Sequence, residues 1–546
     1  MTKFKIFFVL AICSIFLAFV PVSNYFEIAK NLDIFATLYK EVNTYYVDEV
    51  DPEQMIGTGI DAMLASLDPY TNYIPEEDLA AYRTMTTGEY AGIGSLIGKV
   101  GGKNMITMPN AGFPADKAGI KIGDELIAVD GKNVEKLSTS DISKLLKGKP
   151  YTEVVVTVKR YGEKSNIDIA IVRGKITIDN VPYYGMVSDN IGYILLSDFT
   201  TNASKEVQHA LKELKSEGAE SVILDLRDNP GGLLHEAVNI CNLFIPKGKE
   251  VVSTKGKVKD WNKTYKTLNN PFDIQMPLAI LANSGSASAS EIVAGVIQDY
   301  DRGIIVGRKT FGKGLVQTTR PLTYNAQLKV TTAKYYTPSG RCIQALNYSQ
   351  RNDDGSVGKI ADSLKTAYKT TNGRIVYDGG GVDPDLLIEN ELLAPITVSL
   401  IRKGLIFEYA SKYYYEHSEF PKASEFKLSD EEYSKFASWL TTLDYDYTTP
   451  VEQNMDLLLE SAKKESYYSE IESSLSELQN KISHSKETDL MTHQDQITSI
   501  IEENIASRYY LVPGNIEASF DDDLDLIAAI KVLSDTQEYN TLLSKQ

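Results

Sequence analysis

Three glycine-containing segments carry residue types that can do chemistry, and each lies beside a predicted strand. Residues 222–234 (VILDLRDNPGGLL) break from an apolar strand into a Gly-Gly turn, residues 283–292 (NSGSASASEI) carry four serines, and residues 308–317 (RKTFGKGLVQ) hold a lysine between two glycines. The carboxyl ends of neighbouring parallel strands meet at one edge of a sheet, which is the usual place for a site. We therefore expect the three segments to converge there.

The serines of the second segment sit at alternate positions between a predicted buried strand and an apolar helix. A flexible linker has a similar composition, but a linker does not fit between two apolar elements. A serine at a helix N-terminus gains from the helix dipole, which favours its alkoxide and a neighbouring oxyanion. The spacing does not choose among the four candidates, which are Ser284, Ser286, Ser288 and Ser290.

The lysine of the third segment, Lys313, is flanked by Gly312 and Gly314. Most lysines are solvated, but a lysine held on a glycine-rich backbone beside an apolar strand can lose its charge by desolvation and act as a base. A serine with a neutral lysine is an established arrangement for nucleophilic acyl transfer. Gln317 falls on the same strand face as Lys313 if this segment is extended, and its amide would there orient the amine.

A Ser-His-Asp triad is the competing arrangement for the serines. No GxSxG motif is present, and His209 and His235 lie in helical patterns. The histidines show no paired ligand spacing and cysteine clusters are missing, so the sequence predicts no metal site and no cofactor. The Gly-Gly turn of the first segment would present backbone N–H groups at a helix N-terminus to negative charge. A plain strand-to-helix turn is the alternative there.

The elements that must position these segments alternate between strand and helix from about residue 175 to residue 390. This rhythm predicts crossover units on a mostly parallel sheet. The predicted strands are 191–196, 222–226 and 278–281, and the predicted helices are 203–216, 233–244 and 286–297. Residues 88–174 instead show short strands between glycine turns, such as 126–129 and 153–159, with one helix over 140–147.

The two ends of the chain, residues 24–87 and 391–546, are predicted to be helical. The net charge of −18 belongs to the second end, because residues 401–546 hold 13 basic and 28 acidic side chains, a net charge of −15, which leaves −3 for residues 1–400. An acidic chain is a poor nucleic-acid binder. Apolar residues at core-like spacing predict that this acidic end packs on the core or on an adaptor protein.

An export segment opens the sequence. Lys3 and Lys5 precede an apolar run over residues 6–20, as in a secretory signal or an N-terminal anchor. The run is short for a membrane span, but no small-residue cleavage pattern follows it, so the sequence favours an anchor over a cleaved signal. We expect an extracytoplasmic protein on the periplasmic side of the membrane. Cys241 lies in an apolar helical pattern, which predicts a buried thiol, and Cys241 with Cys342 makes no disulfide framework.

The combined motifs resemble those of the carboxyl-terminal processing proteases, also called tail-specific proteases, over about residues 30–390. In that family the middle serine of S-A-S-A-S-E is the nucleophile, which corresponds to Ser288, and the lysine of F-G-K-G-x-V-Q is the general base, which corresponds to Lys313, 25 residues later. The resemblance implies that Gln317 holds the lysine. It also implies a serine endopeptidase with an α/β core of ClpP/crotonase-like fold.

Two further features follow from the same resemblance. The oxyanion hole would use the backbone N–H groups of Gly232 and Ala289, and the GGGVDPD segment at 379–385 matches a family motif. Asp299 corresponds to an aspartate placed in some family triads. It falls at a predicted helix end, where the sequence favours a structural pairing with Arg302.

Residues 88–174 are similar to the PDZ domain that these proteases insert before the core. Gly92-Ile93-Gly94 matches the loop whose N–H groups bind a free C-terminal carboxylate while the peptide adds to the sheet edge. Ile142 and Leu146 are candidates for lining the apolar pocket. A glycine-rich turn without a ligand is the alternative. The expected partners are proteins or peptides with free, apolar C-termini.

The sequence thus predicts a multidomain α/β protein with a helical lead-in, an inserted β-rich domain and a helical extension. The main alternative function is a non-catalytic PDZ-bearing scaffold, which predicts decay of a dyad whose residues are all present here. An esterase or amidase acting on envelope material is a second alternative, and helical ends allow a homodimer. The predicted boundaries are an export segment over 1–23, a helical region over 24–87, a PDZ-like domain over 88–174, a peptidase core over 175–390 and an acidic extension over 391–546.

Overall fold

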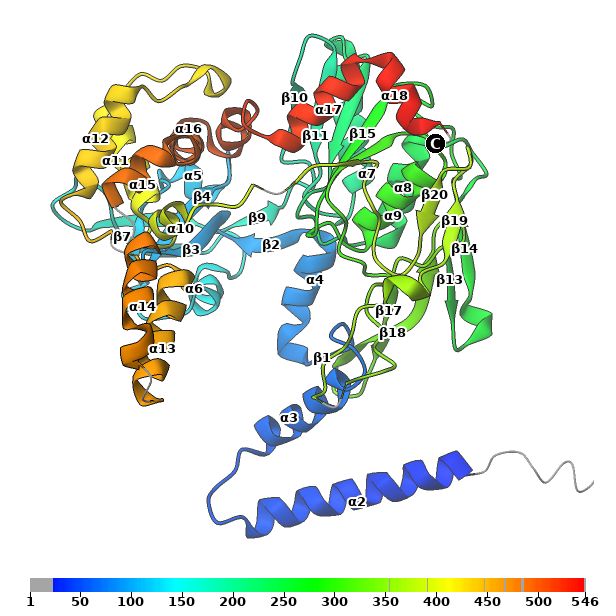
Figure 1. Ribbon diagram of the computed structural model, residues 1–546. Helices are drawn as coiled ribbons and strands as arrows, with labels where there is room; N and C mark the ends of the chain where they lie inside the picture. The colour runs from blue at the N-terminus through cyan, green and yellow to red at the C-terminus, as the bar shows by residue number, and fades with distance from the viewer. Residues whose placement is uncertain are drawn as a thin grey trace, which may run out of the picture. The chain divides into compact units, whose positions relative to one another are not determined.

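The computed structural model describes residues 23–352, 354–389, 391–445, 447–465, 468–482 and 486–544 (Figure 1). The predicted export run over residues 6–20 lies outside them. Among the described residues, no helix combines the length and the hydropathy that a membrane crossing needs. The described part of the chain divides into two compact units, the first within residues 1–76 with 317–331 and the second within residues 77–316 with 332–546.

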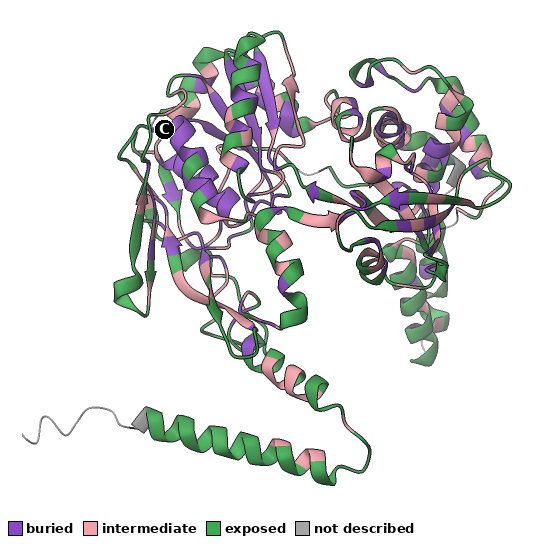
Figure 2. Ribbon diagram, turned by 180° about the vertical axis from the view of Figure 1, so that it is seen from behind, coloured by how far each residue is buried: buried purple, intermediate pink, exposed green. Residues whose placement is uncertain are grey.

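The first unit is built from two helices and a small sheet. Helix α2 (Ser23–Tyr45) is followed by α3 (Pro52–Ala65), whose first turn is capped by the Asp51 carboxylate. Strand β1 (Asn72–Ile74) pairs antiparallel with the start of β18 (Gln327–Tyr336). Helix α2 presents a largely exposed surface (Figure 2). Its large exposed apolar side chains are Tyr25, Phe26, Ile28, Leu32, Ile34, Phe35, Leu38 and Tyr45.

The second unit contains a six-stranded sheet in the order β10-β11-β12-β15-β16-β21. All neighbours pair in parallel except β10, which is antiparallel to β11. The strands are β10 (Tyr183–Met186), β11 (Ile191–Leu195), β12 (Ser221–Asp225), β15 (Leu278–Ala282), β16 (Ile304–Gly307) and β21 (Leu386–Leu387). The residues of the four central strands are nearly all buried, as expected of a parallel sheet covered on both faces.

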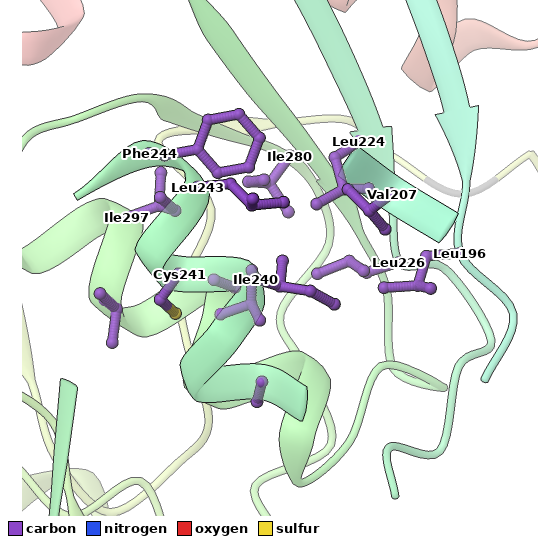
Figure 3. Close-up of a cluster of buried hydrophobic side chains, with 14 of the residues drawn as sticks. Leu196, Val207, Leu224, Leu226, Ile240, Cys241, Leu243, Phe244, Ile280 and Ile297 are labelled. Atoms are coloured by element: carbon purple, nitrogen blue, oxygen red, sulfur yellow. The ribbon is translucent and has the colours of Figure 1, made fainter. Parts of the chain in front are cut away.

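Three crossover helices cover one face of this sheet: α7 (Ala203–Ser216), α8 (Leu234–Phe244) and α9 (Ala289–Asp299). Their apolar sides form one large cluster with alternate strand residues, including Leu224 and Ile280 (Figure 3). Cys241 is fully buried in this cluster, which confirms the predicted buried thiol, and burial raises the pKa of that thiol.

The opposite face of the sheet is covered by two helices from far along the chain, α17 (Leu524–Ser534) and α18 (Thr536–Leu543) (Figure 1). Leu526 and Val532 pack there against Ile223 and Leu281, the strand residues that point away from the crossover helices. Side chains alternate between the two faces of a strand, so these helices bury the half of the sheet that the crossover helices leave bare.

A β-rich module precedes the six-stranded sheet in the sequence. Its sheet has the order β3-β4-β5-β7-β8 with β6 added beside β5, and β2 pairs with β9 at the entrance and exit of the module. Strand β3 therefore forms one edge. The strands are β2 (Glu89–Gly92), β3 (Ser95–Val100), β4 (Lys103–Pro109), β5 (Glu125–Val129), β6 (Lys132–Asn133), β7 (Glu153–Lys159), β8 (Ile167–Val172) and β9 (Gly174–Thr177), and the helices are α5 (Pro114–Lys117) and α6 (Thr139–Leu146).

The helical module between residues 395 and 518 has a core of its own, with Tyr409, Phe436 and Ile501 among its buried residues. Its helices are α10 (Pro395–Arg402), α11 (Leu405–Glu416), α12 (Asp430–Leu440), α13 (Pro450–Lys464), α14 (Tyr468–Ile482), α15 (Lys486–Thr492) and α16 (Gln494–Ala518). Helix α16 bends sharply at Leu511, where the backbone leaves helical angles two residues before Pro513.

The remaining described elements are α4 (Leu79–Thr87), β13 (Glu250–Gly256), β14 (Lys263–Lys266), β17 (Leu315–Pro321), β19 (Ala367–Lys369), β20 (Ile375–Tyr377) and four short 3-10 turns at Glu76–Asp78, Lys259–Trp261, Asp362–Leu364 and Ala423–Glu425. Strand β13 lies between β14 and the end of β18.

One pairing predicted from the sequence is wrong. Asp299, at the end of α9, does not pair with Arg302; its carboxylate faces Arg341 at 2.9 Å, and both side chains are fully buried. Arg302 instead donates to the backbone carbonyls of Phe244, Asp273 and Met276. A linear motif gives no information on Arg341, which comes from a loop more than 40 residues later.

Candidate active site

Ser288 occupies a strained turn between β15 and α9. Its φ is 55° and its ψ is −107°, and it serves as the N-cap of α9. A non-glycine residue rarely adopts a positive φ, and such residues concentrate at functional sites when the surrounding structure holds them. The half-buried side chain therefore stands at a helix N-terminus, where the helix dipole favours negative charge.

The other three serines of the segment have different surroundings. The hydroxyl of Ser286 donates to the carbonyl of Leu226 at 2.7 Å, and that of Ser290 donates to the carbonyl of Asn229 at 2.9 Å. Both side chains are buried, whereas Ser284 is exposed. The alternate spacing thus separates two serines that bind the neighbouring loop from Ser288, which lies at the turn itself.

The buried carboxylate of Glu291 joins the serine turn to the lysine loop. Its Oε2 accepts the backbone N–H of Ser288 and that of Lys313, each at 2.8 Å. Its Oε1 accepts the hydroxyl of Thr310 at 2.6 Å and the N–H of Gly312 at 2.7 Å. Burial raises the pKa of Glu291, and the four hydrogen bonds act against that shift. Ser288 and Lys313 are therefore brought to one oxygen atom through their backbones.

The two glycines beside Lys313 are explained by close backbone contacts. A Cβ at Gly312, where φ is +89°, would lie 2.5 Å from the Ala345 Cβ, and a Cβ at Gly314 would lie 2.8 Å from the Gln344 backbone nitrogen. The Lys313 loop can hold its contact with Glu291 only because these positions lack side chains.

The Gly-Gly turn packs directly on the serine turn. A Cβ at Gly231 would come within 2.9 Å of the Ser288 Cβ and 2.7 Å of the Ala289 nitrogen, and its φ of +91° also requires glycine. The next residue, Gly232, forms a parallel bridge with Phe199, and the N–H of Leu233 donates to the Phe199 carbonyl at 2.8 Å. N–H groups alternate in direction along an extended chain, so that of Gly232 points away from Phe199.

Asn229 fixes the same turn from inside. Its side-chain amide donates to the Leu196 carbonyl at 2.6 Å. Its backbone carbonyl accepts the N–H of Ala287 and the hydroxyl of Ser290. The N–H of Ala289 opens α9 and so belongs to the first turn, whose donors have no partner within the helix. The arrangement offers two backbone donors, at Gly232 and Ala289, beside the turn that carries Ser288.

Gln317 falls in the first compact unit. Its amide donates to the Thr331 hydroxyl at 3.1 Å, and the Thr331 backbone N–H donates to the Thr71 hydroxyl at 3.2 Å. Thr71 in turn donates to the buried carboxylate of Asp68. Gln317 is thus held by residues of its own unit, and its predicted role beside Lys313 stays a prediction.

The glycine loop of the β-rich module is shaped by close packing. Gly94 has a φ of +73°, and a Cβ there would lie 2.6 Å from the Phe113 side chain. The carbonyls of Ile93 and Gly94 accept the N–H groups of Ala115 and Asn110. Gly92 ends β2, and the loop leads straight into the edge strand β3.

The two pocket candidates on α6 are buried. Ile142 and Leu146 belong to the core cluster of the β-rich module, together with Ile93 of the glycine loop, and are 0% and 4% exposed. Helix α6 packs beside β3, so both residues lie next to the edge at which a peptide strand would add.

Two features of the site were missed at the sequence level, namely Glu291 and Asn229. A signal for Glu291 exists, because a serine followed three residues later by glutamate before an apolar run is the capping-box spacing. Asn229 falls in the predicted Asn-Pro-Gly-Gly turn, but nothing in the linear sequence indicates the groups that it binds. Among the described residues, no group of three or more His, Cys, Asp or Glu side chains could hold a metal ion.

Three family models match the chain. Residues 190–349 match Peptidase family S41, residues 96–160 match the PDZ domain, and residues 396–533 match the model described as Probable PDZ-protease, C-terminal helical domain. The S41 match spans the serine turn, the lysine loop and the Gly-Gly turn.

Curated relatives agree with these models. The chain is 37% identical over 321 residues to a carboxy-terminal-processing protease of Bartonella bacilliformis, covering 58% of this chain and 73% of the relative. It is 37% identical over 317 residues to a probable CtpA-like serine protease of Staphylococcus aureus, covering 58% of this chain and 63% of the relative. The chain thus spans less than two thirds of the staphylococcal protein.

Among solved structures, the chain is similar to a photosystem II D1 C-terminal processing protease. The two are 29% identical with a TM-score of 0.36, and the match covers 66% of this chain and 93% of that one. The PDZ domain of a carboxy-terminal protease from Vibrio cholerae in complex with peptide is 27% identical with a TM-score of 0.16, covering 16% of this chain and 99% of that domain.

The family models and the curated relatives together place the chain among the serine proteases of the S41 class. Within that class, the chain belongs to the carboxy-terminal-processing proteases, as the resemblance in its motifs predicted.

The substitution Glu291→Gln tests how far the site depends on the buried carboxylate. Each carboxylate oxygen accepts two donors, so whichever way a glutamine amide turns, its NH₂ group faces two N–H or O–H donors. Two donors are then left without acceptors, and we expect a loss of roughly 2–6 kcal/mol in the free energy of unfolding. Chemical denaturation measures this loss. The exposed Glu213→Gln on α7 is the control, and equal stability of the two variants would contradict the assignment.

Proposed function

We propose that this protein is an extracytoplasmic serine endopeptidase that recognises the C-terminal tails of proteins through its PDZ domain and cleaves peptide bonds with a Ser288–Lys313 dyad. One observation supports the pairing of Ser288 with Lys313: the backbone N–H groups of both residues donate to the same oxygen of the buried Glu291. The strained φ of Ser288 and its place at the N-terminus of α9 support its role as the nucleophile.

The reaction needs no group beyond the protein and water. Neutral Lys313 Nζ takes the proton of Ser288 Oγ as this oxygen bonds to the peptide carbonyl carbon. The carbonyl oxygen becomes an oxyanion, which the N–H groups of Gly232 and Ala289 stabilise. Collapse breaks the C–N bond, and the amine leaves with the proton from Lys313. Water then attacks the acyl carbon and Lys313 accepts its proton. The C–Oγ bond breaks, Lys313 returns the proton to Ser288 Oγ, and the new carboxylate is released.

The substitution Ser288→Ala tests the nucleophile. We expect at least about a 10³-fold loss of kcat on a protein with an apolar C-terminus, because no other group can form the acyl-enzyme. The exposed Ser284→Ala is the matched control and should cleave normally. Thermal unfolding and peptide binding of Ser288→Ala should be those of the wild type. Substantial residual cleavage would refute the assignment, whereas a wild type that cleaves nothing in the same assay would favour a non-catalytic scaffold.

The PDZ domain gives a test of tail recognition. Strand β3 forms the edge of its sheet, directly after the Gly92-Ile93-Gly94 loop, and a bound peptide would add to that edge with its carboxylate on the loop N–H groups. Peptides with a free apolar C-terminus should bind the intact Ser288→Ala protein at least about tenfold more tightly than the same peptides with an amidated end. Equal affinities in a fluorescence titration would rule out carboxylate capture.

The location rests on the basic and apolar pattern of residues 1–23. We expect the full chain to sediment with the cell envelope on fractionation and to be digested by protease added to spheroplasts. Removal of residues 1–23 should leave the protein in the cytoplasm. Protease resistance of the full chain in intact spheroplasts would refute the proposed location. The expectations of a homodimer and of an adaptor at the C-terminal region stay predictions.

A further inference from the structure

Two carboxylates at the start of α17 contact the peptidase core: Asp523, the N-cap of the helix, and Asp525 in its first turn. Asp523 binds Arg227 with both oxygens, at 2.8 Å from Nη1 and 2.6 Å from Nη2. Asp525 lies 3.2 Å from Nη1 of the same arginine and 3.5 Å from Arg308. Arg227 follows the end of β12, so the contact joins parts of the chain that are almost 300 residues apart.

Each of the three guanidinium nitrogens of Arg227 donates to a carboxylate. Asp225, two residues earlier, accepts from Nε and from Nη2, and its Oδ2 also accepts the hydroxyl of Tyr193 at 2.8 Å. The side chains of Asp225 and Asp525 are 2% and 4% exposed, and that of Asp523 is 15% exposed. Burial would lower the pKa of Arg227, but Asp225 and Asp523 raise it, so the guanidinium stays charged.

The chain that follows Arg227 is the proposed oxyanion segment. Asp228 has a φ of +56°, and its backbone N–H donates to the Asn283 side-chain oxygen at 3.0 Å. Asn229 then accepts the N–H of Gly231 with its own side chain at 2.9 Å. Each residue from Arg227 to Gly231 is therefore constrained, and Gly232 follows without an intervening flexible residue. A shift of the Arg227 backbone must move the Gly232 N–H.

We propose that Asp523 and Asp525 are positioning residues for catalysis, which hold the oxyanion segment in place through Arg227. The proposal rests on the proposed function, because it takes Gly232 as an oxyanion donor. Strand β12 and the turn at 228–232 come from the peptidase core, but two of the three carboxylates that bind Arg227 come from the region beyond residue 520. The core on its own would leave this buried guanidinium with one carboxylate, which is a costly state.

The test is Asp523→Asn in the full chain. Asp523 also caps α17 by accepting the N–H of Leu526 at 3.0 Å, and asparagine caps a helix equally well, so the substitution removes the charge and keeps the cap. The matched control is Asp535→Asn, since Asp535 is an exposed N-cap of α18 that accepts the N–H groups of Gln537 and Glu538.

We expect kcat of Asp523→Asn to fall about tenfold or more, since small displacements of an oxyanion donor have effects of this size. KM and the affinity of the PDZ domain for a free-acid peptide should change less than about twofold, because neither depends on the oxyanion hole. Asp523→Glu keeps the charge and should recover part of kcat. Asp535→Asn should leave kcat unchanged.

Three results would overturn the proposal: an unchanged kcat in Asp523→Asn, a fall in kcat equal to that of Asp535→Asn, or a rise in KM that accounts for the whole loss. If Asp523→Asn fails to unfold cooperatively, Asp525→Asn decides, because it removes the second distant charge beside Arg227, and a kcat equal to that of the wild type then refutes the role. Ser288→Ala in the same assay separates the two claims. If Ser288→Ala is inactive and Asp523→Asn is fully active, only the positioning role fails.

Discussion

The buried carboxylate of Glu291 is the interaction on which the site depends. An ionised carboxylate without water is costly unless its oxygens are all bonded, so the chain must bring four donors to it at once. Two are the main-chain N–H groups of Gly312 and Lys313, one is the N–H of Ser288 and one is the Thr310 hydroxyl. The strained serine turn and the glycine-flanked lysine loop both supply backbone donors that this carboxylate requires. Burial makes the contact rigid because no water can replace a lost donor.

Buried arginines repeat this logic around the edge of the sheet. Arg341 faces Asp299, Arg374 binds Asp301 and Asp385, and Arg227 binds the aspartates that flank it in space. The aspartates that bind Arg341 and Arg374 come just before β16 or β21, so these pairs lie at the amino ends of the parallel strands. Arg227 follows β12, so its pairs lie at the carboxyl ends. Loops normally move more than the strands that they connect, and breaking a buried pair costs several kcal/mol. The loop after β12, which leads into the Gly-Gly turn beside Ser288, is therefore held in position by charge pairs.

The periodicity of the sequence predicts most of the core, because alternating strands and helices have clear apolar patterns. Helix α7 and strand β7 begin and end where predicted, at Ala203–Ser216 and Glu153–Lys159. Long-range polar contacts could not be predicted: Asp299 pairs with Arg341 and not with nearby Arg302, and no local signal indicates the groups that Asn229 binds. Linear spacing left four serines open, whereas burial and hydrogen bonds distinguish them. Polar partners depend on loops that meet only after folding, and no local rule contains that information.

Helices α17 and α18 cover one face of the parallel sheet, yet they lie about 300 residues after strand β12 in the sequence. During synthesis the strands and crossover helices emerge first, and this apolar face has nothing to cover it until the region beyond residue 524 is made. Parallel sheets already form slowly because their contacts are distant in sequence. The nascent chain must therefore keep a bare, aggregation-prone surface for the time that translation of the helical module takes, which makes it a natural client for a chaperone.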